Sequence, residues 1–444
     1  MDDDLDQKST PQPHPKKLKI LTTIAIYFGN ITLGYGMNTL APAIEDIRAR
    51  YDASIDEISI VFTVGSISYC MGALAYGFVS KCLNRQILVL AALAGMTFAL
   101  YMFPHCPTKL VFFVVGGVFG FSAGLYDTSQ VVWIIEIWQA KAGPFILAQH
   151  FFYALGSNIP SILIAPFLID ANSSTGKGSE SRIYVPFTIL GAIATLAFLC
   201  QALLFAFYRY YTPPIYANEI DNLVPADKTV SQEPSTETAE IAKSDLSTIF
   251  GWNKRKIQLI AITGMFIGTY QGMEMCTFNF IPIFGQYSNL KMTESASAYV
   301  LTSLTATFAI GRGIGIILIL KVLPEFILFA NLALVLIGNV ILLVWASDNQ
   351  TMFWIGCIIM GTGYSTMYPG FCAFMEKHLV FTDDIGSFMV VLGSTFAAIY
   401  PLIVGKLIEQ KAVVLTYTNF FSSVACVAAL TWGLLIVRKA KKRV

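Results

Sequence analysis

Residues 116–156 read GGVFGFSAGLYDTSQVVWIIEIWQAKAGPFILAQHFFYALG, two long apolar segments joined by a short polar turn. Each segment is long enough to cross a bilayer as a helix, which takes about 20 mostly apolar residues. One carboxylate, Asp127, lies inside the first segment. An Asp at the centre of a membrane helix is unfavourable by about 2.5 to 3.5 kcal/mol on insertion scales, so it usually faces a partner or a water-filled cavity. The stretch predicts a pair of membrane helices beside a polar site.

The rest of the chain has the same membrane character. Of the 444 residues, 55% are hydrophobic and only 13% are charged, a composition that excludes a soluble domain of this size. The eight cysteines are spread singly, so we expect no metal site and no disulfide framework. Nucleotide-binding loops, zinc patterns and nucleophile elbows do not occur in the sequence. We therefore expect no enzyme, no catalytic residue, no organic cofactor and no nucleic-acid partner.

Apolar runs of about 20 residues predict twelve membrane-spanning helices, six in each half of the chain. They cover residues 18–43, 58–79, 87–103, 110–133, 144–168 and 184–207 in the first half, and 257–284, 298–320, 326–345, 352–374, 388–407 and 414–437 in the second.

The intervening polar segments define the expected domains. Residues 1–17 form a cytosolic tail, 18–210 the N-terminal six-helix bundle, 211–256 a cytosolic linker, 257–437 the C-terminal bundle and 438–444 a basic cytosolic tail. The linker contains TVSQEPSTETAEIAKSD, which has too few apolar residues to fold alone.

Most of the 29 lysines and arginines fall on the side that holds both termini, which predicts that this side is cytosolic. The glycosylation sequons at Asn172 and Asn349 both fall on the opposite side, in agreement. We expect a multi-pass protein of the plasma membrane, embedded in the lipid bilayer and functional as a monomer.

Glycine-rich faces on the fourth and tenth predicted helices favour close helix packing. They comprise Gly116, Gly117, Gly120 and Gly124 in one, and Gly356, Gly361 and Gly363 in the other. A chain of six plus six helices with parallel halves resembles the major facilitator superfamily. The resemblance implies an all-α membrane protein with 12 transmembrane helices in two six-helix bundles, which carries a solute by alternating access.

Three segments resemble a narrower group within that superfamily. LYDTSQVVWIIEIW with GPFILAQHFFYALG, TYQGMEMCTFNFIPIF, and GTGYSTMYPGFCAFMEK are similar to the sodium-dependent glucose transporter-like proteins, the major facilitator superfamily domain-containing protein 4 group. More distantly, LYDTSQ and LAQHF resemble the fucose permeases. That resemblance assigns Asp127 and Gln149 to a sugar site. It also places Asn38 where the fucose permeases have a proton-coupling Asp, which puts proton coupling there in doubt.

Helical spacing adds further candidates, because residues three or four apart share a face. Asp, Asn, Gln and Tyr can exchange hydrogen bonds with sugar hydroxyls, while aromatic rings pack on C–H faces. The substrate-binding candidates are Asn38, Asp127, Gln149, His150, Tyr153, Tyr270 and Glu274. Asp127 and Glu274 are also the candidates for binding a coupling ion, as carboxylates that could hold Na⁺ or take up a proton.

Three charged residues, Glu136, Arg312 and Glu376, are expected near cytosolic helix ends, with gating roles. With Arg312 placed there, no cationic side chain remains at mid-membrane depth, which favours a neutral solute over an organic anion. We therefore expect a secondary active hexose transporter, with Na⁺ coupling implied by the resemblance. The alternatives are a proton-coupled or uniport carrier of another neutral polar solute, or a non-transporting receptor on the same fold.

Overall fold

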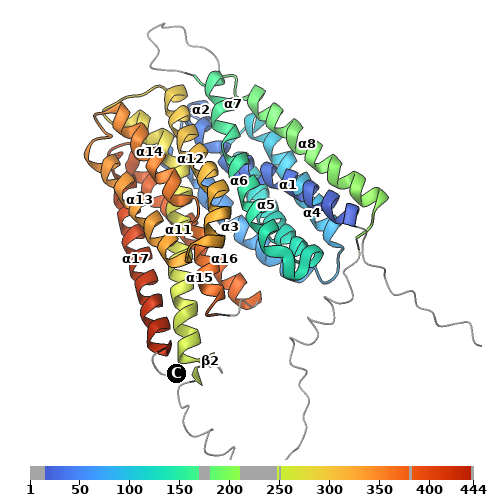
Figure 1. Ribbon diagram of the computed structural model, residues 1–444. Coiled ribbons are helices and arrows are strands. Elements are labelled where there is room, and N and C mark those ends of the chain that lie inside the picture. The colour runs from blue at the N-terminus through green and yellow to red at the C-terminus, as the bar shows by residue number, and fades with distance from the viewer. Residues whose placement is uncertain (1–15, 170–180, 211–247, 250–251, 380–382, 442–444) are drawn as a thin grey trace, which may run out of the picture.

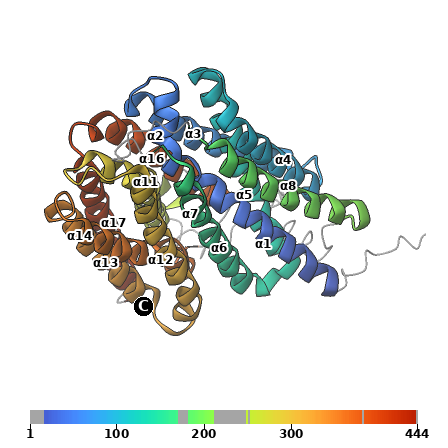
Figure 2. The same ribbon diagram turned by 90° about the horizontal axis from the view of Figure 1, so that it is seen from above.

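The computed structural model describes residues 16–169, 181–210, 248–249, 252–379 and 383–441. Its helices form two groups that lie side by side, one from each half of the chain (Figures 1 and 2). The first group contains α1 (Lys16–Asn38), α2 (Leu40–Arg50), α3 (Ile55–Val79), α4 (Arg85–Met102), α5 (Lys109–Trp138), α6 (Ala142–Ser157), α7 (Ile159–Ile164) and α8 (Tyr184–Phe207), with 3-10 turns η1 (Phe103–His105), η2 (Gln139–Lys141) and η3 (Ala165–Phe167).

The second group contains α11 (Lys254–Tyr287), α12 (Glu294–Lys321), α13 (Pro324–Val344), α14 (Gln350–Tyr364), α15 (Met367–Glu376), α16 (Asp383–Ile408) and α17 (Val414–Lys441). A short antiparallel pairing of β1 (Thr248–Ile249) with β2 (Trp252–Asn253) precedes α11. The all-α fold with twelve spans in two six-helix bundles is confirmed, because every predicted span coincides with a helix or an interrupted helix.

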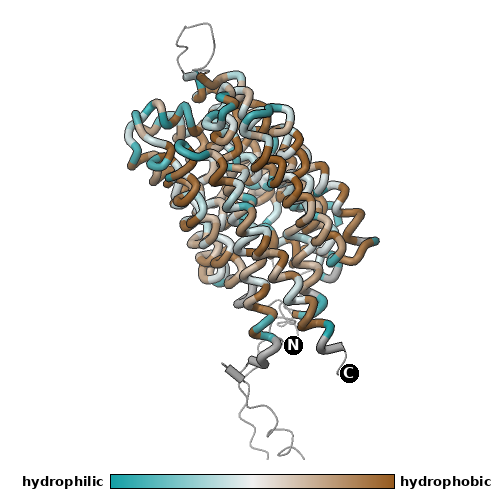
Figure 3. The backbone as a smooth tube through the Cα atoms, turned by 90° about the vertical axis from the view of Figure 1, so that its left-hand side faces the viewer, coloured by the Kyte–Doolittle hydropathy of each residue, from teal (hydrophilic) through white to brown (hydrophobic). Residues whose placement is uncertain are grey.

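Both termini leave the bundles on the same side, which we call the terminal side; the opposite side is the far side (Figure 3). Within the described residues, nine helices are long and apolar enough to cross a membrane. The other three spans are α11, which carries several polar residues, and the interrupted pairs α6–α7 and α14–α15. Which side is cytosolic stays a prediction.

Polar side chains fix where several helices begin. Ser54 accepts from the Glu57 amide at the start of α3, and Thr108 accepts from the Val111 amide at the start of α5. Such caps satisfy amides that have no partner within the helix. Asn349 caps α14 in the same way and is exposed on the far side, where its glycosylation stays a prediction. The second sequon, at Asn172, lies outside the described residues.

Prolines mark three breaks between consecutive helices, those between α1 and α2, α6 and α7, and α14 and α15. Pro42, Pro160 and Pro369 each follow a break by a few residues, at the starts of α2, α7 and α15. Because proline has no amide hydrogen, it leaves the carbonyl four residues earlier without its helical partner. Pro369 in this way leaves the carbonyl of Ser365 free, between α14 and α15. That carbonyl becomes part of the candidate site.

The two bundles are closed against each other on the far side. Glu409, at the end of α16, accepts a hydrogen bond of 2.8 Å from the Ile55 amide at the start of α3. The Tyr287 hydroxyl of α11 donates to Glu45 of α2 at 3.3 Å. We conclude that this conformation holds the far side closed.

Asp46 anchors the far end of the N-terminal bundle, beyond the first predicted span. Its two carboxylate oxygens accept from the Ile169 amide at 3.2 Å and from the Ser181 hydroxyl at 2.6 Å. Burial raises the pKa of Asp46 above its usual range, although these two hydrogen bonds act to lower it. The folded protein therefore takes up this proton at a higher pH than the unfolded chain, and stability falls as pH rises through the raised pKa.

Asp46→Asn is expected to remove that pH dependence. The difference in melting temperature, variant minus wild type, should be larger at about pH 7.5 than at about pH 4.5. At pH 7.5 the wild type buries a charged carboxylate at position 46, and the variant does not. Thermal unfolding in detergent at both pH values measures the difference. Ser181→Ala, which keeps the carboxylate, should keep the wild-type trend. If the melting-temperature difference between Asp46→Asn and the wild type were the same at both pH values, Asp46 would not be the group with the raised pKa.

Candidate functional site

Asp127 is held in a hydrogen-bonded network that joins three helices of the N-terminal bundle. One carboxylate oxygen accepts from the Tyr69 hydroxyl of α3 at 2.5 Å, and the other accepts from the Gln130 amide at 3.0 Å. Gln130 also donates to Asn30 of α1 at 2.6 Å. Asp127 as a residue is half-buried, and the network fixes the orientation of its carboxylate.

The two residues that hold the Asp127 carboxylate directly, Tyr69 and Gln130, are not among the candidates predicted from the sequence. Gln130 could have been found, because it lies three residues after Asp127 and therefore shares its helix face. Tyr69 had no such signal, since it lies on another helix, in an apolar run with no charged neighbour. Its role follows only from the packing of α3 on α5.

Arg312 lies at the boundary between the two bundles, on α12. Its Nε donates to the Ser365 carbonyl that Pro369 leaves free, at 3.1 Å, and its Nη1 donates to the His150 carbonyl of α6 at 3.1 Å. Its Nη2 lies 4.0 Å from a carboxylate oxygen of Glu274 on α11. The guanidinium carbon is 4.2 Å from the ring centre of Phe308, a cation–π contact.

This position corrects the sequence analysis, which placed Arg312 near a cytosolic helix end and found no cation at mid-membrane depth. Arg312 is nine residues before the end of α12 and is only 7% exposed, and its partner Glu274 is 4% exposed in the middle of α11. Span boundaries alone could not reveal this depth, because the partners lie on three other helices. Because Arg312 supplies a cation at this depth, the site no longer disfavours an anionic solute on that ground.

The other two gating candidates have different surroundings. Glu136, near the end of α5, pairs with Arg85 through both carboxylate oxygens and accepts from the Tyr210 hydroxyl at 3.3 Å. Glu136 lies two residues before the end of α5, on the terminal side and nine residues after Asp127, and its gating role stays a prediction. Glu376 is the last residue of α15, and its side chain lies outside the described part of the structure.

The charges at the bundle boundary do not balance. Arg312 interacts electrostatically with both Asp127 and Glu274, so one guanidinium serves two carboxylates. With both carboxylates ionised, the three side chains carry a net charge of −1. A negative charge in a low-dielectric interior is unfavourable unless a cation compensates it. The arrangement can therefore attract a small cation or a proton.

Gln149 is the most conspicuous polar group without a partner. Its side chain is 1% exposed, and neither its amide nitrogen nor its amide oxygen has a hydrogen bond to any described residue. It lies on the α6 face that packs on α1. The residues one turn before and one turn after it both contact α1: the Phe145 carbonyl accepts from the Tyr27 hydroxyl, and the Tyr153 carbonyl lies against Gly34. A buried amide normally finds partners, because leaving it unpaired costs about 1 to 3 kcal/mol.

The remaining candidates lie around the same boundary. The ring centre of Tyr153, on α6, is 5.7 Å from the Arg312 guanidinium carbon. Tyr153 also interacts with the side chain of Asn38, whose amide nitrogen donates to the Gly34 carbonyl at 2.9 Å. His150 packs its ring on Tyr368 of α15, with centres 5.6 Å apart. Tyr270 of α11 donates to the Tyr364 carbonyl at 3.2 Å, at the end of α14.

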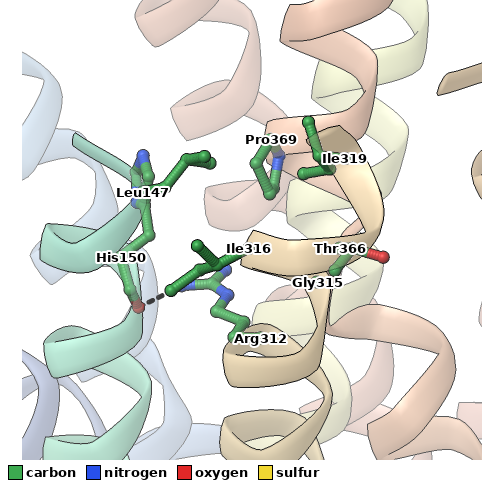
Figure 4. Close-up of a pocket in the computed structure, with 8 residues that line it drawn as sticks. All are labelled: Leu147, His150, Arg312, Gly315, Ile316, Ile319, Thr366 and Pro369. Atoms are coloured by element: carbon green, nitrogen blue, oxygen red, sulfur yellow. Dashed lines mark hydrogen bonds between the residues drawn. The ribbon is translucent and has the colours of Figure 1, made fainter. Parts of the chain in front are cut away.

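A small pocket lies next to Arg312, between α6 and α12 (Figure 4). Its volume is about 10 Å³, which is room for about one water molecule. Ligand pockets are typically about 300 to 1,000 Å³, so a sugar enters only if the bundles move apart. Its lining residues are Leu147, His150, Arg312, Gly315, Ile316, Ile319, Thr366 and Pro369. Among the described residues, no group of three His, Cys, Asp or Glu side chains could hold a metal ion.

Comparison with known proteins agrees with this architecture. A family model described as Major Facilitator Superfamily matches residues 26–380. Sodium-dependent glucose transporter 1 of Homo sapiens is 23% identical over 416 residues, which cover 88% of this chain and 75% of the relative. Major facilitator superfamily domain-containing protein 4A of Xenopus tropicalis is 22% identical, over 94% of this chain and 90% of the relative.

Two solved structures share the fold. A crystal structure of a D-xylose-proton symporter superposes with a TM-score of 0.68 at 12% identity, covering 94% of this chain and 97% of the symporter. A crystal structure of the nucleoside transporter NupG superposes with a TM-score of 0.61 at 14% identity, covering 94% of this chain and 99% of that protein. At this identity the likeness establishes the architecture only.

Proposed function

The chain belongs to the Major Facilitator Superfamily, and from that premise we propose that it is a secondary active transporter of a hexose, coupled to a cation. The observation that carries the proposal is the presence of two features on neighbouring helices, one on α6 and one where α6 meets α11 and α12. One is the buried Gln149 amide, which has no hydrogen-bond partner among the described residues, and the other is the presence of two carboxylates, Asp127 and Glu274, for the one guanidinium of Arg312. The first suits a polar neutral ligand, and the second suits a cation.

The surroundings of Gln149 favour a sugar over other neutral solutes. Tyr153 lies one turn further along α6 and interacts with Asn38, and His150 is the residue next to Gln149. A sugar hydroxyl both donates and accepts hydrogen bonds, which matches an amide with both of its polar atoms free. The names of the relatives, sodium-dependent glucose transporters, support a glucose-like substrate.

Sodium is the proposed coupling cation, on the evidence of the same names. Asp127 is the better placed of the two carboxylates, because it is half-buried and has hydroxyl and amide neighbours, whereas Glu274 already faces Arg312. Carboxylate and hydroxyl oxygens are suitable ligands for a hard cation. A proton could fill the same role, and the transport assay distinguishes the two.

The transport assay uses the purified full-length chain in proteoliposomes. Uptake of radiolabelled D-glucose is measured with an inward sodium gradient, with an inward proton gradient, and with neither. We expect accumulation only under the sodium gradient. Accumulation under the proton gradient alone would replace sodium with a proton, equilibration without either gradient would indicate a uniporter, and no uptake of glucose or fucose under any condition would refute the sugar assignment.

Gln149→Leu is expected to weaken sugar binding with little effect on folding. The change removes an amide that would hydrogen-bond a sugar hydroxyl, which is worth about 1 to 3 kcal/mol, or roughly 5- to 150-fold in the half-saturating sugar concentration. The initial rate of glucose uptake against glucose concentration gives that value.

Gln201→Leu is the matched control for this substitution. Gln201 of α8 is also buried, with an unpartnered amide nitrogen. It differs in its helix: α8 packs mainly on α4 and α1, whereas α6, which carries Gln149, packs on α12 of the C-terminal bundle as well as on α1. The Gln201 variant should leave the half-saturating sugar concentration unchanged. Equal effects of the two substitutions would show that Gln149 acts only through packing.

A further inference from the structure

Gln130 of α5 uses both hydrogens of its side-chain amide on acceptors. Its Nε2 donates to the Asp127 carboxylate at 3.0 Å and to the Asn30 amide oxygen at 2.6 Å. The carboxylate dictates this orientation, because an ionised Asp accepts hydrogen bonds and donates none. Asn30 must then turn its oxygen towards Gln130. The charge of Asp127 therefore sets the direction of two side-chain amides, one on α5 and one on α1.

This orientation leaves one polar atom of each amide without a partner. Oε1 of Gln130 and Nδ2 of Asn30 have no hydrogen bond to any described residue, although the two residues are only 0% and 1% exposed. One atom is an acceptor and the other a donor, on side chains that already touch. If both amides turn over, Nδ2 of Asn30 donates to Oε1 of Gln130. The reversed pair keeps its mutual hydrogen bond and presents an oxygen to Asp127 in place of a nitrogen.

A cation at Asp127 requires oxygen ligands, because hard cations bind through oxygen. The hydroxyls next to Asp127 on α5 face their own helix: Thr128 and Ser129 donate to backbone carbonyls one turn earlier, at 3.0 and 2.5 Å. Within the part of the chain that the structure describes, the side chains that hydrogen-bond Asp127 are Tyr69 and Gln130. Oε1 of Gln130 accepts no hydrogen bond from any described residue, so an ion can bind it without displacing a donor.

We propose that Gln130 is a ligand of the transported sodium ion, and that the amides of Gln130 and Asn30 reverse together when the ion binds at Asp127. This inference rests on the proposed function. In the reversed pair, Oε1 of Gln130 faces the ion beside the carboxylate, and Nδ2 of Asn30 donates to that oxygen. Asn30 lies on α1, about two turns before the sugar candidate Asn38. Ion binding on α5 is thereby transmitted to the helix that carries part of the proposed sugar site.

Gln130→Leu is expected to weaken sodium binding. The purified full-length protein is titrated with sodium chloride, with choline chloride keeping the ionic strength constant, and its melting temperature gives the half-saturating sodium concentration. That concentration should rise by about tenfold in Gln130→Leu, because the ion loses an oxygen ligand. If the amide only donated to Asp127, it would instead compete with the ion, and its removal would lower the half-saturating concentration or leave it unchanged. That result overturns the proposal.

Asn30→Leu is the matched control, because it removes the other buried amide of the pair and the hydrogen bond between them, but no ion ligand. Its half-saturating sodium concentration should stay within about threefold of the wild type. An equal rise in the two variants would mean that the pair acts through packing alone, and Gln130 would not be a ligand.

Infrared spectroscopy tests the reversal in the wild-type protein, and it decides if Gln130→Leu does not fold. The spectrum in sodium chloride minus that in choline chloride should contain a side-chain carbonyl band, because Oε1 of Gln130 gains both the ion and a hydrogen bond from Asn30. The band should shift when the protein contains isotope-labelled glutamine. Absence of a glutamine band, with sodium binding evident from the melting temperature, would contradict the reversal.

The titration also separates this inference from the proposed function. A wild type whose melting temperature responds to sodium, together with an unchanged Gln130→Leu value, overturns the Gln130 assignment and leaves the sodium site at Asp127. A wild type that does not respond to sodium overturns both. The titration contains no sugar, so neither result depends on which solute is transported.

Discussion

Asp127→Asn is expected to reduce gradient-driven sugar accumulation by about 100-fold or more. The substitution keeps the shape of the side chain and removes its charge, so that Glu274 and Arg312 are left as a balanced pair. No uncompensated charge then remains to attract a cation. The amide also cannot accept from both the Tyr69 hydroxyl and the Gln130 amide without presenting its own hydrogens to one of them.

Uptake of labelled glucose into proteoliposomes, with and without a sodium gradient, measures this effect. Tyr69→Phe is the matched control, because it removes the hydrogen bond to Asp127 and keeps the carboxylate. A hydrogen bond to a charged group is worth about 1.5 to 3 kcal/mol, so Tyr69→Phe is expected to lower uptake by up to about 10- to 150-fold. Sodium dependence should nevertheless be retained in Tyr69→Phe and lost in Asp127→Asn, and this difference separates the two variants. An Asp127→Asn protein with wild-type accumulation and unaltered sodium dependence would remove Asp127 from the ion site.

The architecture could be predicted from the sequence because it depends on local properties. Each span is a run of apolar residues, and helix starts are marked by caps such as Ser54 and Thr108. The breaks in the first, fifth and tenth spans were harder to locate, although Pro42, Pro160 and Pro369 mark them. The effect of a proline depends on whether neighbouring groups satisfy the carbonyl it frees, as Arg312 does for Ser365.

The site was predictable only in part, because it depends on contacts between distant segments. Asp127 and Glu274 could be singled out, since a carboxylate inside a membrane span has a high energetic cost. Tyr69 and Arg312 could not be placed, because their partners lie 58 and 38 or more residues away on other helices. The sequence therefore placed Arg312 too close to a helix end, and the predicted set of charges at the bundle boundary lacked its cation.

Gly124→Val is expected to destabilise the protein by about 3 kcal/mol or more and to lower its melting temperature by at least about 5 °C. A Cβ built on Gly124 of α5 would lie 2.0 Å from the Tyr69 carbonyl oxygen and 2.8 Å from its carbonyl carbon. These are backbone atoms of α3, which cannot turn aside as a side chain can. Gly120 approaches the Gly65 carbonyl in the same way, so the two helices are in contact along the glycine face predicted from sequence.

The same substitution also reaches the site, because Tyr69 supplies the hydroxyl that binds Asp127. Moving α3 outward to admit the valine would carry that hydroxyl away from the carboxylate. Gly77→Val is the matched control: it places the same side chain on α3, where a Cβ would meet nothing within 4 Å. We expect its melting temperature to stay within about 1 °C of the wild type, because no atom has to move. Equal melting temperatures for the two variants would mean that α3 and α5 are not packed this closely in the membrane, and Tyr69 would then lose the helix contact that holds it at Asp127.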